Sequence, residues 1–236
     1  MVPYFTKQRN KFANACGHLD VYWKISPLTY TNFNGIKSEL PKYIKGRVLD
    51  AGAGDLTAKP LLTRFCESYF SLDIEKRNVD VDIVDDIQTL STIIDNSIDT
   101  VYSSQVLEHI PTPWNAVKQI YRVLRKDGIA MVTVPHLSAL HEEPYDFYRY
   151  TPYSLDYLFS NEGFQVIKIK KMGGLLSFVF HPISMFLVLI FWPIPVIRWV
   201  MFYANFFLIV LPIVYIDKVL RLDKRFPANI LIVAKK

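Results

Sequence analysis

Residues 47–55, RVLDAGAGD, decide the fold of this chain. They combine a short apolar strand, an acidic residue near its end and two glycines directly after it. Because glycine has no side chain, a ligand can approach the backbone closely at the point where the next helix begins. The stretch therefore predicts a ligand-binding turn between a buried strand and a helix.

Strand and helix patterns alternate around this turn. The predicted strands are residues 46–51, 68–73, 80–84, 98–103, 129–134, 164–171 and 229–235. The predicted helices are residues 57–66, 86–94, 105–109, 113–126 and 152–162. Gly128 is expected to end the fourth helix, and Thr151-Pro152 is expected to begin the fifth. This alternation predicts an α/β fold with a doubly wound, seven-stranded, mostly parallel sheet.

The composition separates two parts of the chain. Of the 236 residues, 51% are hydrophobic and 21% are charged, which excludes a disordered or collagen-like chain. Residues 172–216, however, contain 34 apolar side chains and a single charge, Arg198. The sequence therefore predicts a water-soluble domain with one very apolar insert, and not a polytopic transporter.

The net charge and the positions of the cysteines indicate which binding partners and metals to expect. The net charge of +5 is scattered, so no nucleic acid is expected, and an anionic membrane surface fits it at least as well. Cys16 and Cys66 lie in no cluster with metal-ligand spacing, so we expect a reducing compartment and no metal. The N-terminal residues lack an apolar stretch, and no secretory signal is expected.

Acidic residues follow three of the predicted strands. Asp50 precedes the glycines, Asp73 ends the second strand, and Asp85-Asp86 end the third. Open α/β sheets bind ligands at these carboxyl ends, where Asp73 can accept both hydroxyls of a ribose. The pair at 85–86 is either a partner for an adenine amino group or a helix cap. A nicotinamide dehydrogenase needs a third glycine where this chain has Thr57.

In this order of motifs the chain resembles the class I S-adenosylmethionine-dependent methyltransferases. It is most similar to the type 11-like branch, which includes quinone-biosynthesis and polysaccharide-cluster methyltransferases. The resemblance covers residues 46–171 and 227–236 and includes the segments SSQVLEH at 103–109 and VTVPH at 132–136. It implies a Rossmann-like fold with an antiparallel last strand and S-adenosylmethionine as the cofactor. One further family glycine is replaced by Leu56.

The resemblance also implies which residues hold the cofactor. They are the glycine motif, the ribose-side and adenine-side acids with their neighbours, and the residues after the fourth strand. In this chain these are Asp50, Ala51, Gly52, Gly54, Asp73, Ile74, Asp86, Ile87, Ser104 and Gln105.

The loop after the fifth strand is the expected acceptor side of the site. Because histidine titrates near neutral pH, His136 or His141 is the candidate base for a hydroxyl acceptor. Glu142 is the candidate orienting carboxylate or a substrate contact. The alternative is a structural loop in which Asp146 and Arg149 pair locally. Methyl transfer can also proceed by alignment and desolvation without a base.

The apolar insert predicts a helical hairpin. Residues 172–197 and 199–216 carry no charge, and prolines at 193 and 195 separate them. Each half is close to the length of a membrane span, and basic residues flank both ends, as expected for a domain on the cytoplasmic face. A hairpin in one leaflet is favoured over two full spans, and a lid in a dimer interface is the alternative.

One helical stripe within the insert is polar. Ser177, His181 and Ser184 share a face, which in hydrocarbon should contact protein or water, with Asn205 as the expected partner.

The predicted organisation therefore has three parts. A helical cap spans 1–45 and includes a turn at 32–35, the methyltransferase domain spans 46–171 plus 227–236, and the membrane-associated insert spans 172–226. We expect an S-adenosylmethionine-dependent methyltransferase that acts at a lipid bilayer on a lipid-linked or amphipathic small molecule. O-methylation is favoured over C-methylation. The alternatives are a soluble small-molecule or sugar methyltransferase that is a homodimer through the insert, and a catalytically silent cofactor-binding subunit.

Overall fold

A computed structural model describes residues 2–16, 21–76 and 78–236. Its internal contacts divide the chain into two compact units. Unit 1 comprises Met1–Gly35 with Met172–Ala228, and unit 2 comprises Ile36–Lys171 with Asn229–Lys236. The contacts thus group the N-terminal residues with the apolar segment, whereas the three-part domain division stays a prediction.

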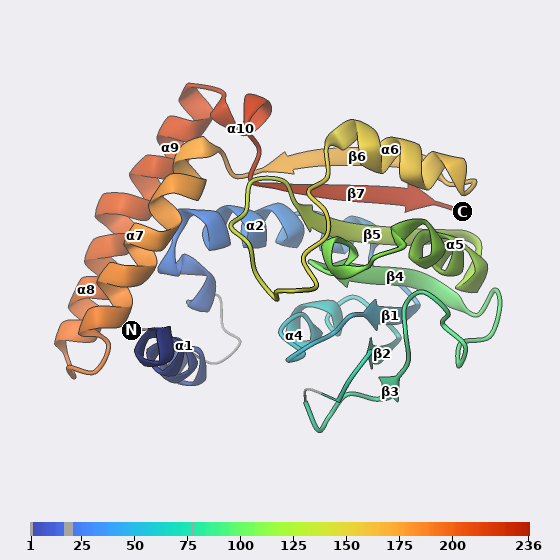
Figure 1. Cartoon of the computed structure of the whole chain (residues 1–236), viewed down its shortest axis with the longest axis horizontal. Helices are drawn as coiled ribbons and strands as arrows, with labels where there is room; N and C mark the ends of the chain where they lie inside the picture. The colour runs from blue at the N-terminus through green and yellow to red at the C-terminus, as the bar shows by residue number, and fades with distance from the viewer. Residues whose placement is uncertain (1, 17–20, 77) are drawn as a thin grey trace. The chain divides into compact units, whose positions relative to one another are not determined.

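Unit 2 is built on a seven-stranded sheet with the strand order β3-β2-β1-β4-β5-β7-β6 (Figure 1). The strands are β1 (Arg47–Ala51), β2 (Ser68–Asp73), β3 (Ile83–Val84), β4 (Ile98–Ser104), β5 (Leu124–Pro135), β6 (Gln165–Met172) and β7 (Asn229–Lys235). The pairs from β3 through β5 are parallel, and β7 is antiparallel to β5. The predicted α/β fold, with its seven strands and antiparallel last strand, is confirmed.

The strand order fixes the place of the ligand site. From β1 the chain first continues to one side, through β2 and β3, and then returns to the other side, to β4. Ligands bind at such a reversal point, at the carboxyl end of the central strands. The glycine motif of residues 52–54 lies directly after β1, which is this position.

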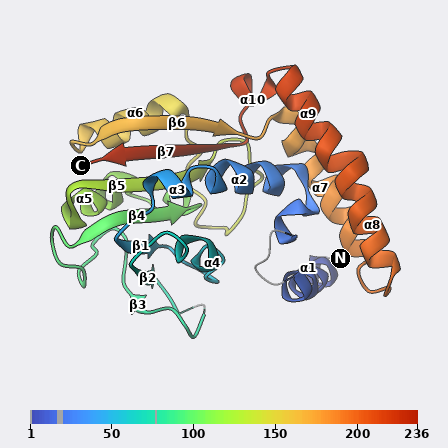
Figure 2. The same cartoon turned by 180° about the vertical axis from the view of Figure 1, so that it is seen from behind.

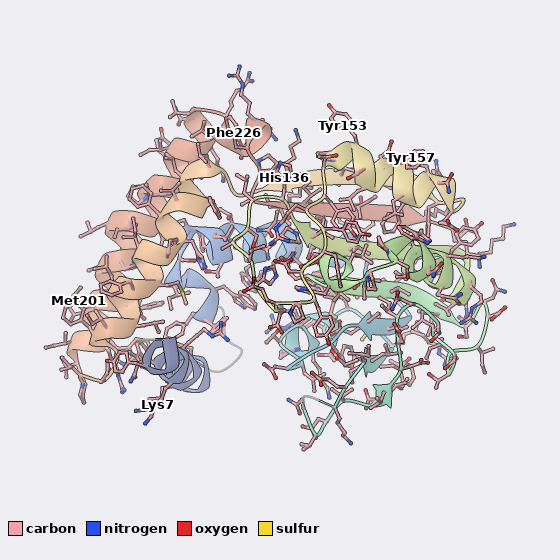
Figure 3. All side chains as sticks on the ribbon, in the orientation of Figure 1. Lys7, His136, Tyr153, Tyr157, Met201 and Phe226 are labelled. Carbon is pink, nitrogen blue, oxygen red and sulfur yellow. The ribbon has the colours of Figure 1, made fainter. Side chains whose placement is uncertain are left out.

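Helices cover both faces of the sheet. Those of unit 2 are α3 (Leu40–Tyr43), α4 (Lys59–Leu62), η2 (Leu107–His109), α5 (Pro113–Val123) and α6 (Pro152–Asn161). The helices α5 and α6 lie on one face and α3 on the other (Figures 1 and 2). On the outer side of α6, Tyr153 and Tyr157 are exposed and point away from the sheet (Figure 3). The core between the helices and the sheet consists mostly of aliphatic side chains from both, with Tyr150, Phe159 and Phe164 among them.

The capping of α6 was predicted correctly. Thr151 has extended backbone angles, and its hydroxyl accepts a hydrogen bond from the backbone N–H of Ser154 at 3.0 Å. The Ser154 hydroxyl in turn lies 2.9 Å from the Thr151 backbone N–H, which completes a capping box.

Two helix predictions in unit 2 were wrong. Residues 86–94 form turns, because Asp85 binds the backbone N–H and hydroxyl of Thr92 and so draws this segment away from a helical path. The helix predicted at 113–126 ends at Val123, because Leu124 is extended and begins β5. Gly128 therefore lies within β5 and caps no helix.

Unit 1 is helical. Its elements are α1 (Val2–Cys16), η1 (Tyr22–Ile25), α2 (Pro27–Lys37, which ends in unit 2), α7 (Leu175–Phe191), α8 (Ile197–Asn205), the π-helical turn η3 (Phe206–Val210), α9 (Leu211–Val219) and α10 (Leu222–Arg225). The chain breaks between α7 and α8 at the prolines, as predicted, and Val196 there has a φ of 68°. A cluster around Phe12, Trp192 and Phe202 forms the core of this unit.

The turn predicted at 32–35 is also wrong, because these residues lie inside α2. Gly35 has a packing role there. A Cβ at this position would lie 2.2 Å from the sulfur of Met172, so only glycine lets the two segments approach.

Candidate active site

The glycine turn after β1 needs both of its glycines for backbone reasons. Gly52 has a φ of +83°, and a Cβ there would lie 2.3 Å from a methyl group of Val106. Gly54 has a φ of +51°, but no atom lies within 4 Å of the place a Cβ would take. The backbone N–H groups of Gly52 and Ala53 both donate to the carbonyl of Leu72. The turn is thus fixed against the end of β2, and the space beside Gly54 is open.

Two buried carboxylates flank this turn. Asp50 is 2% exposed and accepts a hydrogen bond from the Tyr69 hydroxyl at 2.7 Å. Asp73 is 6% exposed and accepts one from the Gly54 backbone N–H, also at 2.7 Å. Burial raises the pKa of Asp50 to about 7, and the charge of Asp73 acts in the same direction. The turn therefore places two carboxyl groups, those of Asp50 and Asp73, where they could bind a cation or accept hydrogen bonds from hydroxyl groups.

The structure separates the roles of the adjacent acids Asp85 and Asp86. The carboxylate of Asp85 is occupied by donors from its own turn, which include the backbone N–H of Thr92 at 2.8 Å. Burial would raise the pKa of Asp85, but these hydrogen bonds outweigh it and lower the pKa. Asp86 binds only Gln88 among the described contacts. Asp85 is thus the structural cap, and Asp86 is the better candidate for a ligand contact.

The apolar neighbours of these acids are placed differently from one another. Ile74, directly after Asp73, is 62% exposed, whereas Ile87 is 5% exposed and belongs to the core cluster. An exposed isoleucine directly after Asp73 offers an apolar surface beside that carboxylate. Ile87 is buried in the core and so offers almost no surface to a ligand.

Thr133 of β5 binds both Ser104, the last residue of β4, and Gln105, which follows it. The hydroxyls of Ser104 and Thr133 are 2.7 Å apart, and the Gln105 backbone N–H donates to the Thr133 carbonyl at 2.9 Å. Gln105 has a φ of +57°, and its side chain reaches the same Thr133 hydroxyl at 3.3 Å. Both predicted residues therefore lie at the carboxyl edge of the sheet, next to the glycine turn across Val106.

His136 is held by a hydrogen bond that defines its tautomer. Its Nδ1 lies 2.7 Å from the carbonyl oxygen of Tyr150. A carbonyl only accepts, so Nδ1 carries the hydrogen, and a neutral ring keeps a free electron pair on Nε2. That arrangement suits a general base.

The predicted alternative of a local ion pair in the acceptor loop is also present. Arg149 donates to both oxygens of Asp146, at 2.5 and 2.7 Å, and these hydrogen bonds hold the pKa of Asp146 well below its usual range. Asp146 also accepts from the His141 backbone N–H at 3.0 Å and lies 3.6 Å from the ring Nδ1 of His141. Asp146 is therefore a carboxylate beside His141 that sequence reasoning did not select. Glu142 is exposed on the same loop, and its role stays a prediction.

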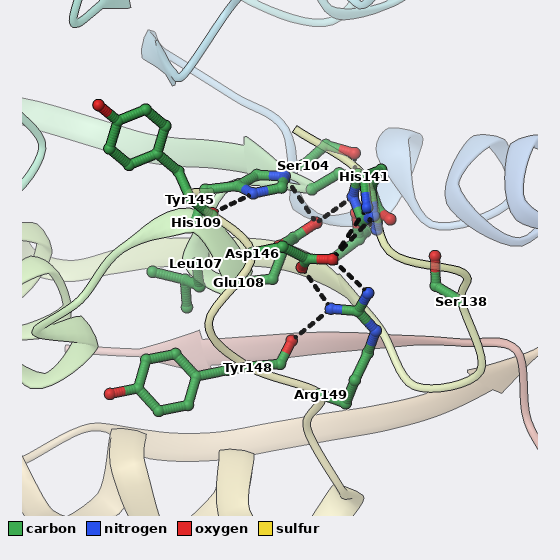
Figure 4. A network of polar contacts seen from close by, with 12 residues as sticks. Ser104, Leu107, Glu108, His109, Ser138, His141, Tyr145, Asp146, Tyr148 and Arg149 are labelled. Carbon is green, nitrogen blue, oxygen red and sulfur yellow. Dashed lines mark hydrogen bonds and ion pairs between the residues drawn. The ribbon is translucent and has the colours of Figure 1, made fainter. Parts of the chain in front are cut away.

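Glu108 is the residue that sequence reasoning missed. Its side chain is fully buried, and neither carboxylate oxygen has a hydrogen-bond partner among the described residues. Burial raises the pKa of Glu108 to about 8. His109 and His141 lie beside it (Figure 4). A charged residue between Leu107 and Ile110, both of which are buried, was the available sequence signal.

A separate cavity of about 450 Å³ lies in unit 1. It is lined by Lys11, Ala15, Trp192, Pro193 and Arg198. None of these residues belongs to the predicted cofactor or acceptor site, so this cavity is not part of it.

Comparison with protein families identifies the domain that carries this site. The profile of a methyltransferase-domain family matches residues 49–132, which run from β1 into β5 and include the glycine turn, Asp73 and Asp86. Residues 49–132 thus match a methyltransferase domain, and this match supports an S-adenosylmethionine-dependent enzyme of class I. No curated protein matches the methyltransferase by sequence.

Solved structures agree with this fold. An S-adenosylmethionine-dependent methyltransferase from Archaeoglobus fulgidus is 19% identical, with a TM-score of 0.53 over 86% of this chain and 94% of that one. Phosphoethanolamine N-methyltransferase 2 of Haemonchus contortus, in complex with S-adenosyl-L-methionine, is 16% identical, with a TM-score of 0.59 over 97% of this chain and 60% of that one. The [4+2]-cyclase SpnF is also 16% identical, with a TM-score of 0.59 over 88% and 81%. At these identities the likeness shows the fold alone.

The residues present fit S-adenosylmethionine, the cofactor of this methyltransferase. The carboxylate of Asp73 is buried at the end of β2, Asp86 follows β3, and no atom lies within 4 Å of the place that a Cβ of Gly54 would take. The predicted set of contact residues thus lies along one edge of the sheet, at or directly after the carboxyl ends of β1, β2, β3 and β4.

Proposed function

We propose that this methyltransferase acts at a membrane on a lipid-linked or amphipathic acceptor, with O-methylation favoured over C-methylation. The polarity of unit 1 supports this. Ser177, Ser184, Asn205 and Asp217 are all buried in it. The same helices expose large apolar side chains, which include Val179, Ile183, Ile190, Val200, Phe207, Leu208, Ile216 and Val219. A water-soluble protein has the opposite distribution, and such an apolar surface favours contact with lipid.

Most of these polar side chains have partners inside unit 1, whereas the buried Ser184 hydroxyl has none among the described residues. Ser177 donates to Asp217 at 2.6 Å, and the ring Nδ1 of His181 lies 2.7 Å from the hydroxyl of Ser26. Asn205 donates to the carbonyl of Ile25 at 2.8 Å and does not bind the stripe, contrary to the sequence prediction. The predicted inward orientation of the stripe is confirmed for Ser177 and His181.

The length of α7 favours a hairpin within one leaflet over two full spans. Within the described residues, one continuous segment, Ile197–Val219, is long and apolar enough to cross a membrane, with 23 residues and a mean hydropathy of 2.1. At 1.5 Å per residue it is about 35 Å long. The partner α7 has 17 residues and is about 26 Å long, which is shorter than the roughly 30 Å of the bilayer interior.

The basic flanks of the segment are unequal. Lys168 and Lys170 both bind Glu39 at 2.9 Å, so they are engaged within unit 2. The flank after α9 exposes Lys218, Arg221 and Arg225. An attraction to anionic lipid on the cytoplasmic face therefore rests on this second flank.

Methyl transfer to a hydroxyl acceptor requires a group that removes the hydroxyl proton. S-adenosylmethionine, when bound, supplies a methyl group on a positively charged sulfur. A hydroxyl acceptor must lose its proton, and the free Nε2 of His136 is suited to take it. We propose His136 as the base, with His141 as the alternative.

Methyl-labelled S-adenosylmethionine, incubated with the detergent-purified protein and a crude host extract, tests the acceptor class. We expect label in the organic phase, lost in Asp73→Asn and reduced about 10²–10⁴-fold in His136→Gln. Label confined to the aqueous phase would leave a methyltransferase with a soluble acceptor. Cofactor binding without any labelled product would favour the silent subunit.

Flotation with vesicles that contain anionic lipid tests membrane association separately. The variant Val200→Lys/Leu208→Lys places charges on exposed apolar positions of unit 1, and we expect its membrane-bound fraction to fall more than tenfold, since a lysine in hydrocarbon costs about 2.5–3.5 kcal/mol. The matched control Val79→Lys/Ile94→Lys changes exposed apolar positions of unit 2 and should float like the wild type. Wild-type protein that stays out of the vesicle fraction would refute the membrane proposal.

A further inference from the structure

We infer that Glu108, His109 and His141 form a binding site for one divalent transition-metal ion of the Zn²⁺ type. Oε1 of Glu108 lies 3.8 Å from Nε2 of His109 and 3.9 Å from Nε2 of His141. All three potential ligand atoms lie within 4.8 Å of one another (Figure 4). The distances from Glu108 are too long for hydrogen bonds, and the rings of His109 and His141 meet edge to face with their centroids 4.8 Å apart.

The tautomers of the two histidines make both Nε2 atoms electron-pair donors. Nδ1 of His109 lies 2.7 Å from the carbonyl of Tyr145, and Nδ1 of His141 lies 3.1 Å from the carbonyl of Ala139. Each carbonyl only accepts, so each Nδ1 carries the hydrogen. Metal-bound histidines are held in this way, with the second ring nitrogen donating to a carbonyl or carboxylate.

The side chain of Glu108 supplies an independent observation in favour of a cation ligand. Its side chain is 0% exposed, and both of its oxygens lack a hydrogen-bond donor within the described part of the chain. The nearby cation Arg149 is already engaged by Asp146 and by the carbonyls of Ala139 and Tyr148. A buried carboxylate without any donor is rare in native proteins, and a metal ion would satisfy it.

The second layer of contacts fixes the loop that carries His141. The backbone N–H groups of Phe147 and Tyr148 donate to the carbonyl of Glu108, at 2.9 and 3.2 Å. Asp146, oriented by Arg149, lies 3.6 Å from Nδ1 of His141. The chain segment after β5 is therefore attached to the segment after β4 at the very place where their side chains converge.

Two imidazoles and one carboxylate suit Zn²⁺ or a similar first-row ion and leave coordination positions open. Those positions fit water or an oxygen atom of an acceptor. A role in aligning the acceptor rests on the proposed function, but metal binding does not.

Metal binding is measured without cofactor or acceptor. The purified protein is stripped with a chelator, and Zn²⁺ alone is added in a calorimeter. Co²⁺ is added in parallel, and its visible absorption reports the ligand geometry. We expect one ion per chain and binding weakened more than about 100-fold in Glu108→Gln and in His141→Ala. His136→Gln is the matched control from the same loop and should bind Zn²⁺ like the wild type.

Thermal unfolding guards against a variant that merely fails to fold. Zn²⁺ should raise the melting temperature of the wild type and of His136→Gln but not of Glu108→Gln. A stripped wild type that binds no ion, or variants that bind Zn²⁺ as tightly as the wild type, would overturn the inference. S-adenosylmethionine titrated into the same samples measures cofactor binding independently. A failure to bind Zn²⁺ can therefore be told apart from a failure to bind the cofactor.

Discussion

Each unit of this molecule contains a buried carboxylate, and the two differ in how many hydrogen-bond donors they have. In unit 1, Asp217 is 2% exposed and accepts from the backbone N–H groups of Leu176 and Ser177 and from the Ser177 hydroxyl, at 2.6–3.0 Å. In unit 2, Glu108 is equally buried and has no donor among the described residues. The contrast shows what the chain does when a buried charge is structural, and so marks Glu108 as a residue that awaits a partner from outside.

Two further carboxylates lie between these extremes. Glu39 is 2% exposed and binds three lysines, Lys42, Lys168 and Lys170. Asp50 has a single donor, the Tyr69 hydroxyl. The number of donors thus falls from Asp217 and Glu39 to Asp50 and then to Glu108, and removing each group tests the order.

Removal of Asp217 should have the largest effect. Asp217→Ala leaves two N–H groups at the start of α7 and the Ser177 hydroxyl without their acceptor, which we expect to lower the free energy of unfolding by about 3–5 kcal/mol. Chemical denaturation in detergent measures it. Asp223→Ala, on the neighbouring α10, is the control and should change the value by less than about 0.5 kcal/mol. A loss below about 1 kcal/mol would mean that α7 does not depend on this cap.

Glu39→Gln should have an intermediate effect, about 1–3 kcal/mol at pH 7, because the lysines are partly exposed and lose only the charge of their partner. Burial alone would raise the pKa of Glu39, but the hydrogen bonds from Lys168 and Lys170 outweigh it and lower the pKa to about 2. The stabilisation is therefore complete above the unfolded value near 4.5 and is lost as the pH falls towards 2.

Urea denaturation of Glu39→Gln and wild type at pH 7, 4.5 and 3 checks this window. The difference between the two proteins should shrink at the lowest pH, whereas the exposed Asp156→Asn should match the wild type at pH 7. A difference independent of pH would contradict the charge-based explanation.

Asp50→Asn should have the smallest effect on stability, and of opposite sign. Burial raises the folded pKa to about 7 from 3.8, so the native state binds a proton that the unfolded state releases between these values. Wild-type stability from this group therefore falls as the pH rises from about 4 to 7. A shift of this size corresponds to about 4 kcal/mol at pH 7. Loss of the hydrogen bond from the Tyr69 hydroxyl to the carboxylate offsets part of it, so we expect Asp50→Asn to be more stable than the wild type by about 1–2 kcal/mol at pH 7 and similar to it near pH 4. Equal pH profiles would show that Asp50 is solvated in the native state.

The sequence predicted those features that depend on neighbouring residues. The stretch 47–55 contains the strand, its acid and both glycines, and Thr151 and Ser154 are close enough for their capping pattern to be read directly. The sheet followed from the alternation of such local patterns. These predictions succeeded because the decisive contacts are short in sequence.

Features that depend on distant contacts could not be predicted in this way. The NFNG segment lies within α2, and its Gly35 lies against Met172, far along the chain. The turns near residue 90 depend on local contacts, but these come from the side chain of Asp85, which accepts several donors from its own turn, and no helix-periodicity pattern reports them. Glu108 meets His141 only because the loop after β5 returns to β4, and the tautomers follow from carbonyls that no motif encodes.

The position of β7 has a consequence for biosynthesis. This strand lies between β5 and β6, yet the ribosome makes it after the whole of Met172–Ala228. Until then β5 and β6 each present an unpaired edge. The most apolar helices of the chain have already emerged by that time, and their apolar side chains are exposed. The sheet is thus completed last, by a strand delivered from beyond the apolar helices, and the nascent chain is most prone to aggregate during that interval.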